Sequence, residues 1–352
     1  MNSINEIKIG ICIPTIRENC LKKFLELWKP QFDLENVCFY ITEDSDRKQI
    51  YYKHLFREYK KAHHKEYSHK EIGEDLGKNS WIICKKNSSH REYGYYKAWQ
   101  DKCDMIVTLD DDCYPLKGVR FLEAHWNKLN MNINMWGSTS YDCWGKSIPV
   151  RGMPYKNTEV KNKVIINHGL WKNNLDLDAP HQLCSGDTKI DITEVPLVFG
   201  KYKSMCGMDL SFKGEATPLM YFGLQGNDWE FDRFDDIWCG IIAQKIAIHL
   251  GKHITNGTPM IWHNKASNPF KNLIKEAKGI EVNEIFWQAI ESIQLSSSTY
   301  TNCYKEIAMA LPNKISCYPE YFLQLNRAMM IWAGLFEDKN AVRRSKQRHN
   351  RF

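Results

Sequence analysis

The first forty residues alternate short apolar runs with a segment of helical spacing. Residues 7–14 (IKIGICIP) form an apolar, β-branched run that stops at Pro14, and residues 36–42 (NVCFYIT) form a second one. Between them, apolar side chains recur at helical spacing over residues 19–28. The pattern predicts strand, helix and strand, an order typical of a parallel sheet with crossover helices.

A second set of elements follows residues 47–80, a charged segment in which we expect an excursion with some helix. Residues 81–84 (WIIC) and 105–109 (MIVTL) predict two more strands, and residues 91–102 predict a helix between them. The chain therefore continues as an α/β fold.

Polar residues follow three of the predicted strands. They are Thr15-Ile16-Arg17, Asp44-Ser45-Asp46 and Asp110-Asp111-Asp112. In open parallel sheets, ligands bind beyond the carboxyl ends of the strands. We therefore expect these three groups to face one ligand.

The second half of the chain predicts a pocket region and then helices. Residues 130–205 are rich in Asn, Gly, Pro and Trp and predict loops and short strands around a pocket. A helix is predicted over about 235–250, ending at Gly251. Helical spacing continues over 284–337 with breaks near Pro312 and Pro319, which predicts a C-terminal helical annex.

Composition narrows the class of protein. The 352 residues are 43% hydrophobic, enough for a full core, and the net charge of +6 permits a phosphate-bearing ligand. Basic residues gather only at the end of the chain, where a solvated, flexible tail over 341–352 is favoured over nucleic-acid binding. We expect no nucleic-acid partner.

Twelve cysteines without a CxxC pair predict reduced thiols rather than disulfides. The polar start of the chain and the lack of a run of eighteen apolar residues predict a cytoplasmic protein without a transmembrane segment. Peripheral attachment to a membrane and homo-oligomer formation stay open.

The acidic triplet is the first candidate site. Three consecutive carboxylates repel one another, and a divalent cation such as Mn²⁺ or Mg²⁺ prefers such oxygen ligands at a strand end. A solvated turn is the alternative, but the apolar MIVTL before the triplet places it at the rim of a buried sheet. Asp110 and Asp112 are therefore predicted metal ligands.

His263 in IWHNKASNPF is the candidate for a further metal ligand. A packed histidine is the alternative, and the donor-rich residues after it, among them Lys265 and Asn268, suit a phosphate. Asp235 and Asp236 open the predicted helix at 235. One of them is expected to cap that helix, and the other can accept a hydrogen bond from a sugar hydroxyl or act as a base.

Several enzyme classes are excluded by missing motifs. The sequence has no GxGxxG after the first strand, no GxxxxGK[ST] and no GxSxG. We therefore expect neither flavin nor nicotinamide as cofactor, and neither a P-loop kinase nor a serine hydrolase.

Separated motifs along the whole chain resemble one family, the plant UDP-arabinopyranose mutases or reversibly glycosylated polypeptides. The matching stretches run in order: IPTIRE (13–18), DSD (44–46), REYGY (91–95), LDDDC (109–113), VRGMP (150–154), HGLW (168–171), LDAPHQL (177–183), MCGMDLSF (205–212), PLMYFGLQG (218–226), RFDDIWCG (233–240) and WHNKASNPFKNL (262–273).

The resemblance implies a GT-A-like nucleotide-sugar-binding catalytic domain over 1–283, with the annex over 284–340 packed on it and the sheet mixed but mostly parallel. It implies that the ligand is a nucleotide sugar, with a UDP-sugar favoured and a GDP-sugar open. The substrate side would include Thr15, Arg17, Asp44, Asp46, Arg91, Asp110, Asp111, His168, Trp171, Lys265 and Asn268. The predicted catalytic residues are Arg151, Asp209, Asp235 and Asp236.

Two positions depart from the family pattern. The family glycosylates an arginine a few residues beyond the VRGMP position, and the ungapped equivalent here is Thr158. Asp209 stands where the family has asparagine. Lysines 156, 161 and 163 are near enough in sequence to substitute for the arginine if the geometry allows.

Three hypotheses follow. The first is a metal-dependent mutase that interconverts pyranose and furanose forms of a nucleotide sugar and so supplies furanose donors for glycan synthesis. The second is a glycosyltransferase, retaining or self-glycosylating, because the fold and the metal site would look the same. The third is a non-catalytic scaffold subunit of a mutase complex.

Overall fold

The computed structural model describes residues 3–131, 133–134, 159–160, 163–174, 176–185, 189–190, 202, 204–264 and 268–337. Arg151, Thr158, Lys265 and the basic tail lie outside these ranges. No helix within them is long and apolar enough to cross a bilayer. The cysteines within them are free, and most are buried.

The strands are β1 (Ile9–Thr15), β2 (Val37–Glu43), β3 (His63–Tyr67), β4 (Met105–Leu109), β5 (Cys113–Pro115), β6 (Ile133–Asn134), β7 (Glu159–Val160), β8 (Val164–Asn174), β9 (Lys189–Ile190), β10 (Asp209–Lys213) and β11 (His253–His263). The α-helices are α1 (Glu18–Phe32), α2 (Tyr52–Leu55), α3 (His69–Leu76), α4 (Glu92–Gln100), α5 (Phe121–Leu129), α7 (Ala179–Ser185), α8 (Asp235–His249), α9 (Pro269–Ser292), α10 (Tyr300–Ala310) and α11 (Pro319–Gly334).

The main sheet has the order β3-β2-β1-β4-β10-β8-β11-β5, with β9 beside β8. Strands β3, β2, β1 and β4 run parallel, whereas β10 is antiparallel to both of its neighbours, β4 and β8. Strand β11 returns parallel to β8. The α/β fold with a mixed sheet, expected from the sequence, is therefore confirmed.

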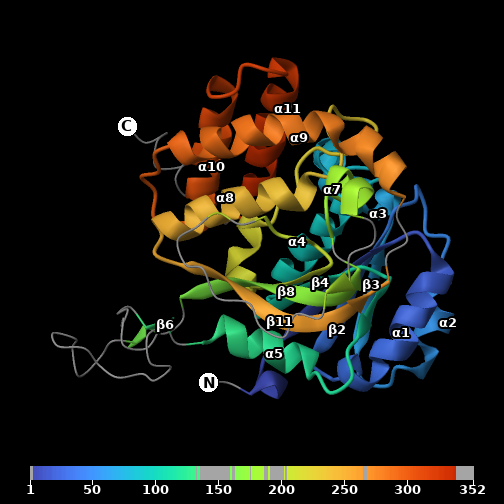
Figure 1. Ribbon diagram of the computed structural model, residues 1–352. Coiled ribbons are helices and arrows are strands. Elements are labelled where there is room, and N and C mark those ends of the chain that lie inside the picture. The colour runs from blue at the N-terminus through green and yellow to red at the C-terminus, as the bar shows by residue number, and fades with distance from the viewer. Residues whose placement is uncertain are drawn as a thin grey trace, which may run out of the picture.

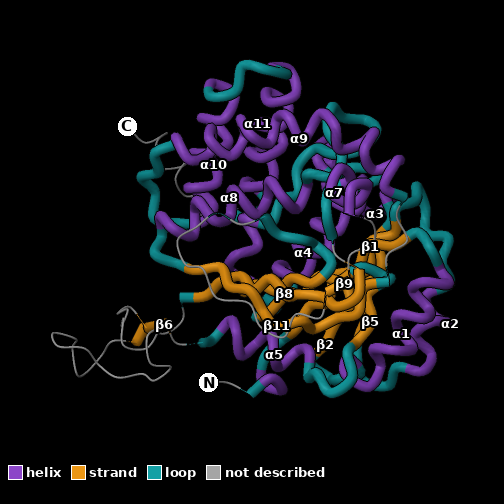
Figure 2. Tube along the Cα trace, viewed as in Figure 1, coloured by secondary structure: helices purple, strands orange, loops and turns teal. Residues whose placement is uncertain are grey.

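Helices cover both faces of this sheet (Figures 1 and 2). On one face, α1 and α5 pack on Ile9, Ile11 and Ile13 of β1, which point to the same side because side chains alternate along a strand. On the other face lie α4, α8 and the C-terminal helices. Each face has its own apolar core, and a residue's place in a strand decides which core it joins.

The C-terminal helices share the second core. The Trp238 ring of α8 stacks on Phe286 of α9 with centroids 4.5 Å apart, and Trp332 of α11 donates its indole N–H to the carbonyl of Pro218 at 3.0 Å. Helix α9 begins at Pro269, so the expected boundary at 283/284 falls inside one continuous helix. The annex is thus joined to the sheet domain through α9.

One local prediction was wrong. Residues 81–84 do not form a strand. The 3-10 helix Gly77–Ile82 leads into a loop, and these residues are apolar because they pack into the core. The charged segment 47–80 contains the expected helix, as α2 and α3, and also β3, an edge strand parallel to β2 that the sequence analysis missed. An edge strand faces solvent, so it lacked the apolar run that marks a buried strand.

Candidate active site

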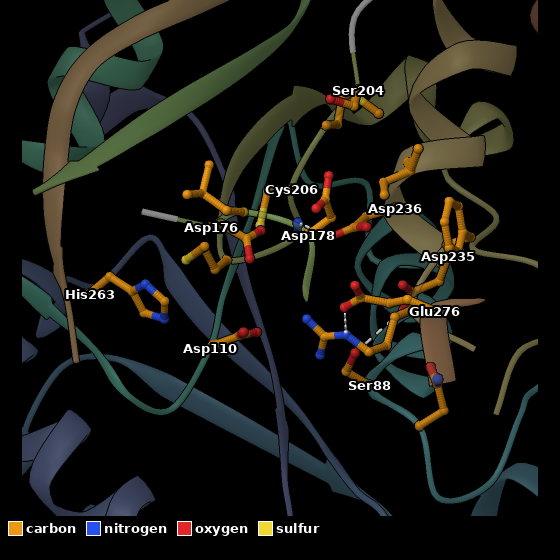
Figure 3. A pocket seen from close by; sticks show the side chains of 18 of the residues that line it. Ser88, Asp110, Asp176, Asp178, Ser204, Cys206, Asp235, Asp236, His263 and Glu276 are labelled. Carbon is orange, nitrogen blue, oxygen red and sulfur yellow. Dashed lines mark hydrogen bonds and ion pairs between the residues drawn. The ribbon is translucent and has the colours of Figure 1, made fainter. Parts of the chain in front are cut away.

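A cavity of about 780 Å³ opens at the carboxyl ends of β1 and β4. Its walls come from the triplet, from β8, from the segment before β10, from the start of α8 and from α9. In Figure 3, His263 and Asp110 lie on one side, and Asp235, Asp236 and Glu276 on the other. The cavity therefore gathers residues that are more than 250 positions apart in the sequence, from Arg17 to Glu276.

The three carboxylates of the triplet have different partners. Asp110 lies 2.5 Å from a terminal nitrogen of Arg91. Asp111 is buried and accepts hydrogen bonds from the Thr15 hydroxyl, at 2.8 Å, and from Arg17. Burial raises the pKa of Asp111, and the Arg17 charge opposes that shift. Asp111 is thus a structural anchor for Thr15 and Arg17.

Asp112 faces the cavity with less support. Arg17 lies 3.8 Å from its carboxylate, beyond hydrogen-bond distance. Burial and the neighbouring Asp110 raise the pKa of Asp112 to about 6, while His263 lowers it. A carboxylate crowded by other carboxylates in this way favours a bound cation.

Arg91 organises the floor of the cavity. Its Nε donates to the carbonyl of Ser88 at 3.0 Å, and one terminal nitrogen donates to the carbonyl of Gly207 at 2.7 Å and to the Thr108 hydroxyl at 3.2 Å. The side chain is 3% exposed. With every nitrogen engaged, Arg91 holds Asp110 in place rather than offering donors to a ligand.

Asp235 and Asp236 both lie in the first turn of α8. The capping position is occupied by Phe234, and neither aspartate caps the helix, so the expected capping role was wrong. Asp236 accepts the backbone N–H of Gly207 at 2.9 Å, and Ser88 donates to Asp235 at 3.4 Å. Burial and the charge of Asp235 raise the pKa of Asp236 well above its ordinary value.

His168 and Trp171 of β8 line the cavity, as does His263 at the end of β11. The rings of His168 and Trp171 meet edge to face, with centroids 5.7 Å apart. Since β8 and β11 are adjacent parallel strands, their ends deliver these three side chains to one wall.

A smaller cavity of about 260 Å³ shares residues with the first, among them Arg17, Asp110 and Asp112. It is also lined by Thr15 and Asp44. Asp44 pairs with His69 at 2.8 Å and accepts the backbone N–H of Lys86 at 3.0 Å. The predicted nucleotide residues Thr15, Arg17 and Asp44 are thus together at one end.

Asp209 is not where a catalytic residue would need to be. It lines neither of these cavities, is fully buried on the α5 face of the sheet, and lies 2.9 Å from Nε2 of His125. The His125 ring also contacts Ser211 at 2.7 Å and Asn167 at 2.9 Å. We correct the prediction: Asp209 belongs to a buried polar network behind the sheet.

Two predicted substrate residues also lie elsewhere. Asp46 lines neither cavity, is 87% exposed and pairs with Lys85 at 2.9 Å. Asn268 caps helix α9, where its side-chain oxygen accepts the backbone N–H groups of Phe270 and Lys271. Asn268 is therefore the N-cap residue of α9.

Some lining residues were missed by the sequence analysis. They are Lys86, Asn87, Ser88, Asp176, Asp178, His181, Cys206, Arg233, Lys275 and Glu276. Several belong to motifs already noted, such as LDAPHQL and RFDDIWCG, but Glu276 occurs inside a helix with no local signal. Only the packing of α9 places it in the cavity wall.

The residues fit a divalent cation only in part. Within the described ranges, no group of three or more His, Cys, Asp or Glu side chains is arranged to hold a metal ion. Asp110, Asp112 and His263 nevertheless line one cavity, where burial and the charge of Asp110 raise the pKa of Asp112. Mg²⁺-type sites use one or two carboxylates plus substrate phosphates, and that donor set matches these residues.

The sequence comparisons cover nearly the whole chain. A family model described as reversibly glycosylated polypeptide matches residues 4–341. A probable UDP-arabinopyranose mutase 1 of Pisum sativum is 33% identical over 346 residues, which cover 95% of this chain and 91% of that protein. UDP-arabinopyranose mutase 3 of Arabidopsis thaliana is 34% identical over 355 residues, with 95% and 92% covered.

Solved structures are more distant. Glucosyl-3-phosphoglycerate synthase from Mycobacterium tuberculosis, in complex with Mn²⁺ and uridine-diphosphate-glucose, has a TM-score of 0.41 and 9% identity, with 81% of this chain and 77% of that chain covered. TarS 1–349 of S. aureus has a TM-score of 0.41 and 10% identity, with 96% and 92% covered. The family match and the identity to its members decide the assignment: the chain belongs to the reversibly glycosylated polypeptide family.

Proposed function

We propose that the protein is a UDP-sugar mutase that interconverts the pyranose and furanose forms of a UDP-linked pentose such as arabinose. One observation carries the proposal: a single cavity is lined by Asp110 and Asp112 of the acidic triplet and, on its other side, by the adjacent Asp235 and Asp236. Relatives named UDP-arabinopyranose mutase, matched over more than nine tenths of their length, support the choice of reaction.

The reaction defines what the site must do. The bond between the anomeric carbon and the diphosphate breaks, and a different sugar hydroxyl then bonds to that carbon. The bond from that carbon to the original ring oxygen breaks next, and the diphosphate returns to the same carbon. No net oxidation occurs. The closing hydroxyl loses a proton, and the ring oxygen that leaves gains one.

Asp235 and Asp236 suit this proton exchange. Burial raises the pKa of both carboxyls, the charge of Asp235 further raises that of Asp236, and Arg91 lowers that of Asp235. Adjacent buried carboxyls cannot both ionise readily, so the pair can retain one proton near neutral pH. A shared proton lets the pair accept from one sugar oxygen and donate to another.

The triplet suits the diphosphate end. Asp110 and Asp112 would hold a divalent cation, with His263 in the same cavity, and the bound cation would neutralise charge on the diphosphate. Thr15 and Arg17, fixed by Asp111, would contact the nucleotide beside it. His168 and Trp171 would form the wall against which the pentose packs.

The direct test is ring exchange. The protein is incubated with UDP-arabinopyranose and Mn²⁺, and the pyranose and furanose forms are resolved by NMR. We expect both forms to appear from either starting form. If the UDP-sugar is instead consumed, with release of free UDP and formation of a new glycoside but no ring exchange, the protein is a glycosyltransferase. The same nucleotide-binding residues would serve that reaction.

A further inference from the structure

Two cationic residues of the cavity wall have left-handed backbone conformations. Lys86 has φ +55° and Arg233 has φ +67°, and both line the larger cavity. Residues other than glycine adopt such angles at an energetic cost, and the surrounding structure must hold them there. Both cations of this cavity wall are therefore held in their turns by contacts with neighbouring residues.

The two turns are bonded to each other. Asn87, which follows Lys86, donates its side-chain N–H to the carboxylate of Asp232 at 2.8 Å, and Asp232 precedes Arg233. The same segments also meet upstream, where the backbone N–H of Gln225 donates to the Cys84 sulfur at 3.2 Å. These two contacts hold the turns that carry Lys86 and Arg233 against each other.

Glu276 of α9 fixes the side chain of Arg233. One carboxylate oxygen of Glu276 accepts from Nε of Arg233 at 2.6 Å, and the other accepts the backbone N–H of Ala179 at 2.7 Å. Glu276 is 4% exposed, and a dashed line at this residue marks the ion pair in Figure 3. Among the described residues, the terminal nitrogens of Arg233 have no hydrogen-bond partner.

Most other cations of the cavity are already engaged. Arg17 is bound to Asp111, and all nitrogens of Arg91 have partners. Lys275 pairs with Asp232 at 2.7 Å. Within the part of the chain that the structure describes, Lys86 has no side-chain ion pair. The ammonium of Lys86 and the terminal nitrogens of Arg233 are therefore available to a ligand.

We propose that Lys86 and Arg233 form a cation clamp that binds the diphosphate of the nucleotide sugar. The planar guanidinium can donate two parallel hydrogen bonds to phosphate oxygens, and the ammonium supplies a compact charge. Asn87, Asp232 and Glu276 are positioning residues, because their side-chain contacts hold the two turns and the Arg233 side chain in place. The ligand class rests on the proposed function.

Binding rather than turnover tests the clamp. Isothermal titration calorimetry with UDP and with UMP is carried out on the wild type, Lys86→Gln and Arg233→Gln, once with Mn²⁺ and once with a chelator. We expect each variant to weaken UDP binding by about 10-fold or more, as for loss of a hydrogen bond to a charged group. UMP, which lacks the second phosphate, should be affected less, so the preference for UDP over UMP should fall.

Lys278→Gln is the matched control. Lys278 is an exposed cation on α9 that pairs with Glu230 and lines neither cavity. The Lys278→Gln variant removes the same charge from the same region, and we expect the UDP affinity of this variant to equal that of the wild type. Thermal unfolding of every variant shows whether a loss of binding reflects a loss of folding. If Arg233→Gln does not fold, the UDP affinity of Lys86→Gln, a change on an exposed turn, tests the clamp by itself.

Glu276→Gln tests the positioning role. The amide keeps the shape of the side chain but removes the charge that orients Arg233, so UDP affinity should fall and the UDP-to-UMP preference should shrink. A purely structural role would lower the unfolding temperature and leave this preference unchanged.

Failure of the clamp and failure of the mutase proposal are distinguishable. Wild-type UDP affinity in both Lys86→Gln and Arg233→Gln overturns the clamp, whatever the reaction. If UDP binding depends on Lys86 and Arg233 but the protein shows no ring exchange, the clamp proposal stands and the mutase proposal is refuted. A wild-type protein that binds no UDP with or without Mn²⁺ refutes both.

Discussion

Arg91, at the end of the 3-10 helix Ser88–Arg91, and Asp110, the first residue of the triplet, form an ion pair of 2.5 Å. The same guanidinium bonds to the carbonyl of Gly207, whose N–H is bonded to Asp236. One buried arginine thus links the two carboxylate groups on opposite sides of the cavity. Arg91 therefore couples the position of Asp110 to that of Asp236.

Replacement of Arg91 should therefore affect stability and function together. Arg91→Met removes the guanidinium donors to the carbonyls of Ser88 and Gly207, of which Gly207 keeps only the Thr108 hydroxyl at 3.3 Å, and it removes the partner of Asp110. We expect a loss on the order of 3 kcal/mol in the free energy of unfolding. Urea denaturation measures this loss, and NMR ring exchange measures activity at a temperature where the variant is folded. A variant as stable as the wild type would contradict the linking role.

Removing Asp112 should weaken metal binding. We expect Asp112→Asn to lower Mn²⁺ affinity in the presence of UDP by about 10-fold or more, because an amide is a poorer ligand than a carboxylate. Electron paramagnetic resonance of free Mn²⁺ gives the affinity. Asp46→Asn is the control, since Asp46 is exposed and lines neither cavity. Equal Mn²⁺ affinity in Asp112→Asn and the wild type would place any metal elsewhere.

The buried Asp209 should tolerate an amide but not a small side chain. In Asp209→Asn the amide oxygen can still accept from His125, so we expect the free energy of unfolding to change by less than about 1 kcal/mol, whereas Asp209→Ala loses about 2 kcal/mol. UDP affinity should be unchanged in Asp209→Asn. Loss of ring exchange in a stable Asp209→Asn protein would restore the catalytic assignment.

The packing around Asp209 can also be tested at Gly169, which lies on the neighbouring strand β8. A Cβ atom at Gly169 would lie 2.2 Å from the Asp209 carboxyl group. Gly169→Ala should therefore destabilise the protein by about 1–3 kcal/mol through overpacking. In an Asp209→Ala background the clash is removed, so a double-mutant cycle from urea denaturation should give a coupling of about 1 kcal/mol or more. Additive effects would show that the two side chains do not compete for space.

Glu92 should make stability depend on pH. It is fully buried and accepts the backbone N–H of Phe222 at 2.6 Å. Burial raises its pKa well above its ordinary value, a shift that the Phe222 N–H opposes. The folded state then binds more protons than the unfolded state, so stability falls as pH rises above the unfolded pKa, by up to about 1.4 kcal/mol per pH unit.

Glu92→Gln removes this proton while it keeps the acceptor for Phe222. Urea denaturation from about pH 5 to about pH 8 should show a smaller loss of stability in the variant than in the wild type. The difference between the two proteins isolates Glu92 from the other titrating groups. Parallel pH profiles would mean that Glu92 keeps its charge in the folded state.

The sequence by itself determined the frame of the protein. The apolar runs at 7–14, 36–42 and 105–109 became β1, β2 and β4, and the helices at 19–28 and 235–250 became α1 and α8. These elements are buried and locally periodic, so hydrophobic pattern alone specifies them. The triplet follows β4 directly, and its place at the rim of the sheet therefore follows from chain order.

Only the tertiary structure decided which polar residues meet. Asp209 and His168 lie on adjacent strands, yet alternation along those strands sends Asp209 to His125 behind the sheet and His168 into the cavity. Arg233 and Glu276 are 43 residues apart and meet because α9 packs across the start of α8. Such contacts depend on helix packing and strand order, and a single sequence carries no local pattern for either.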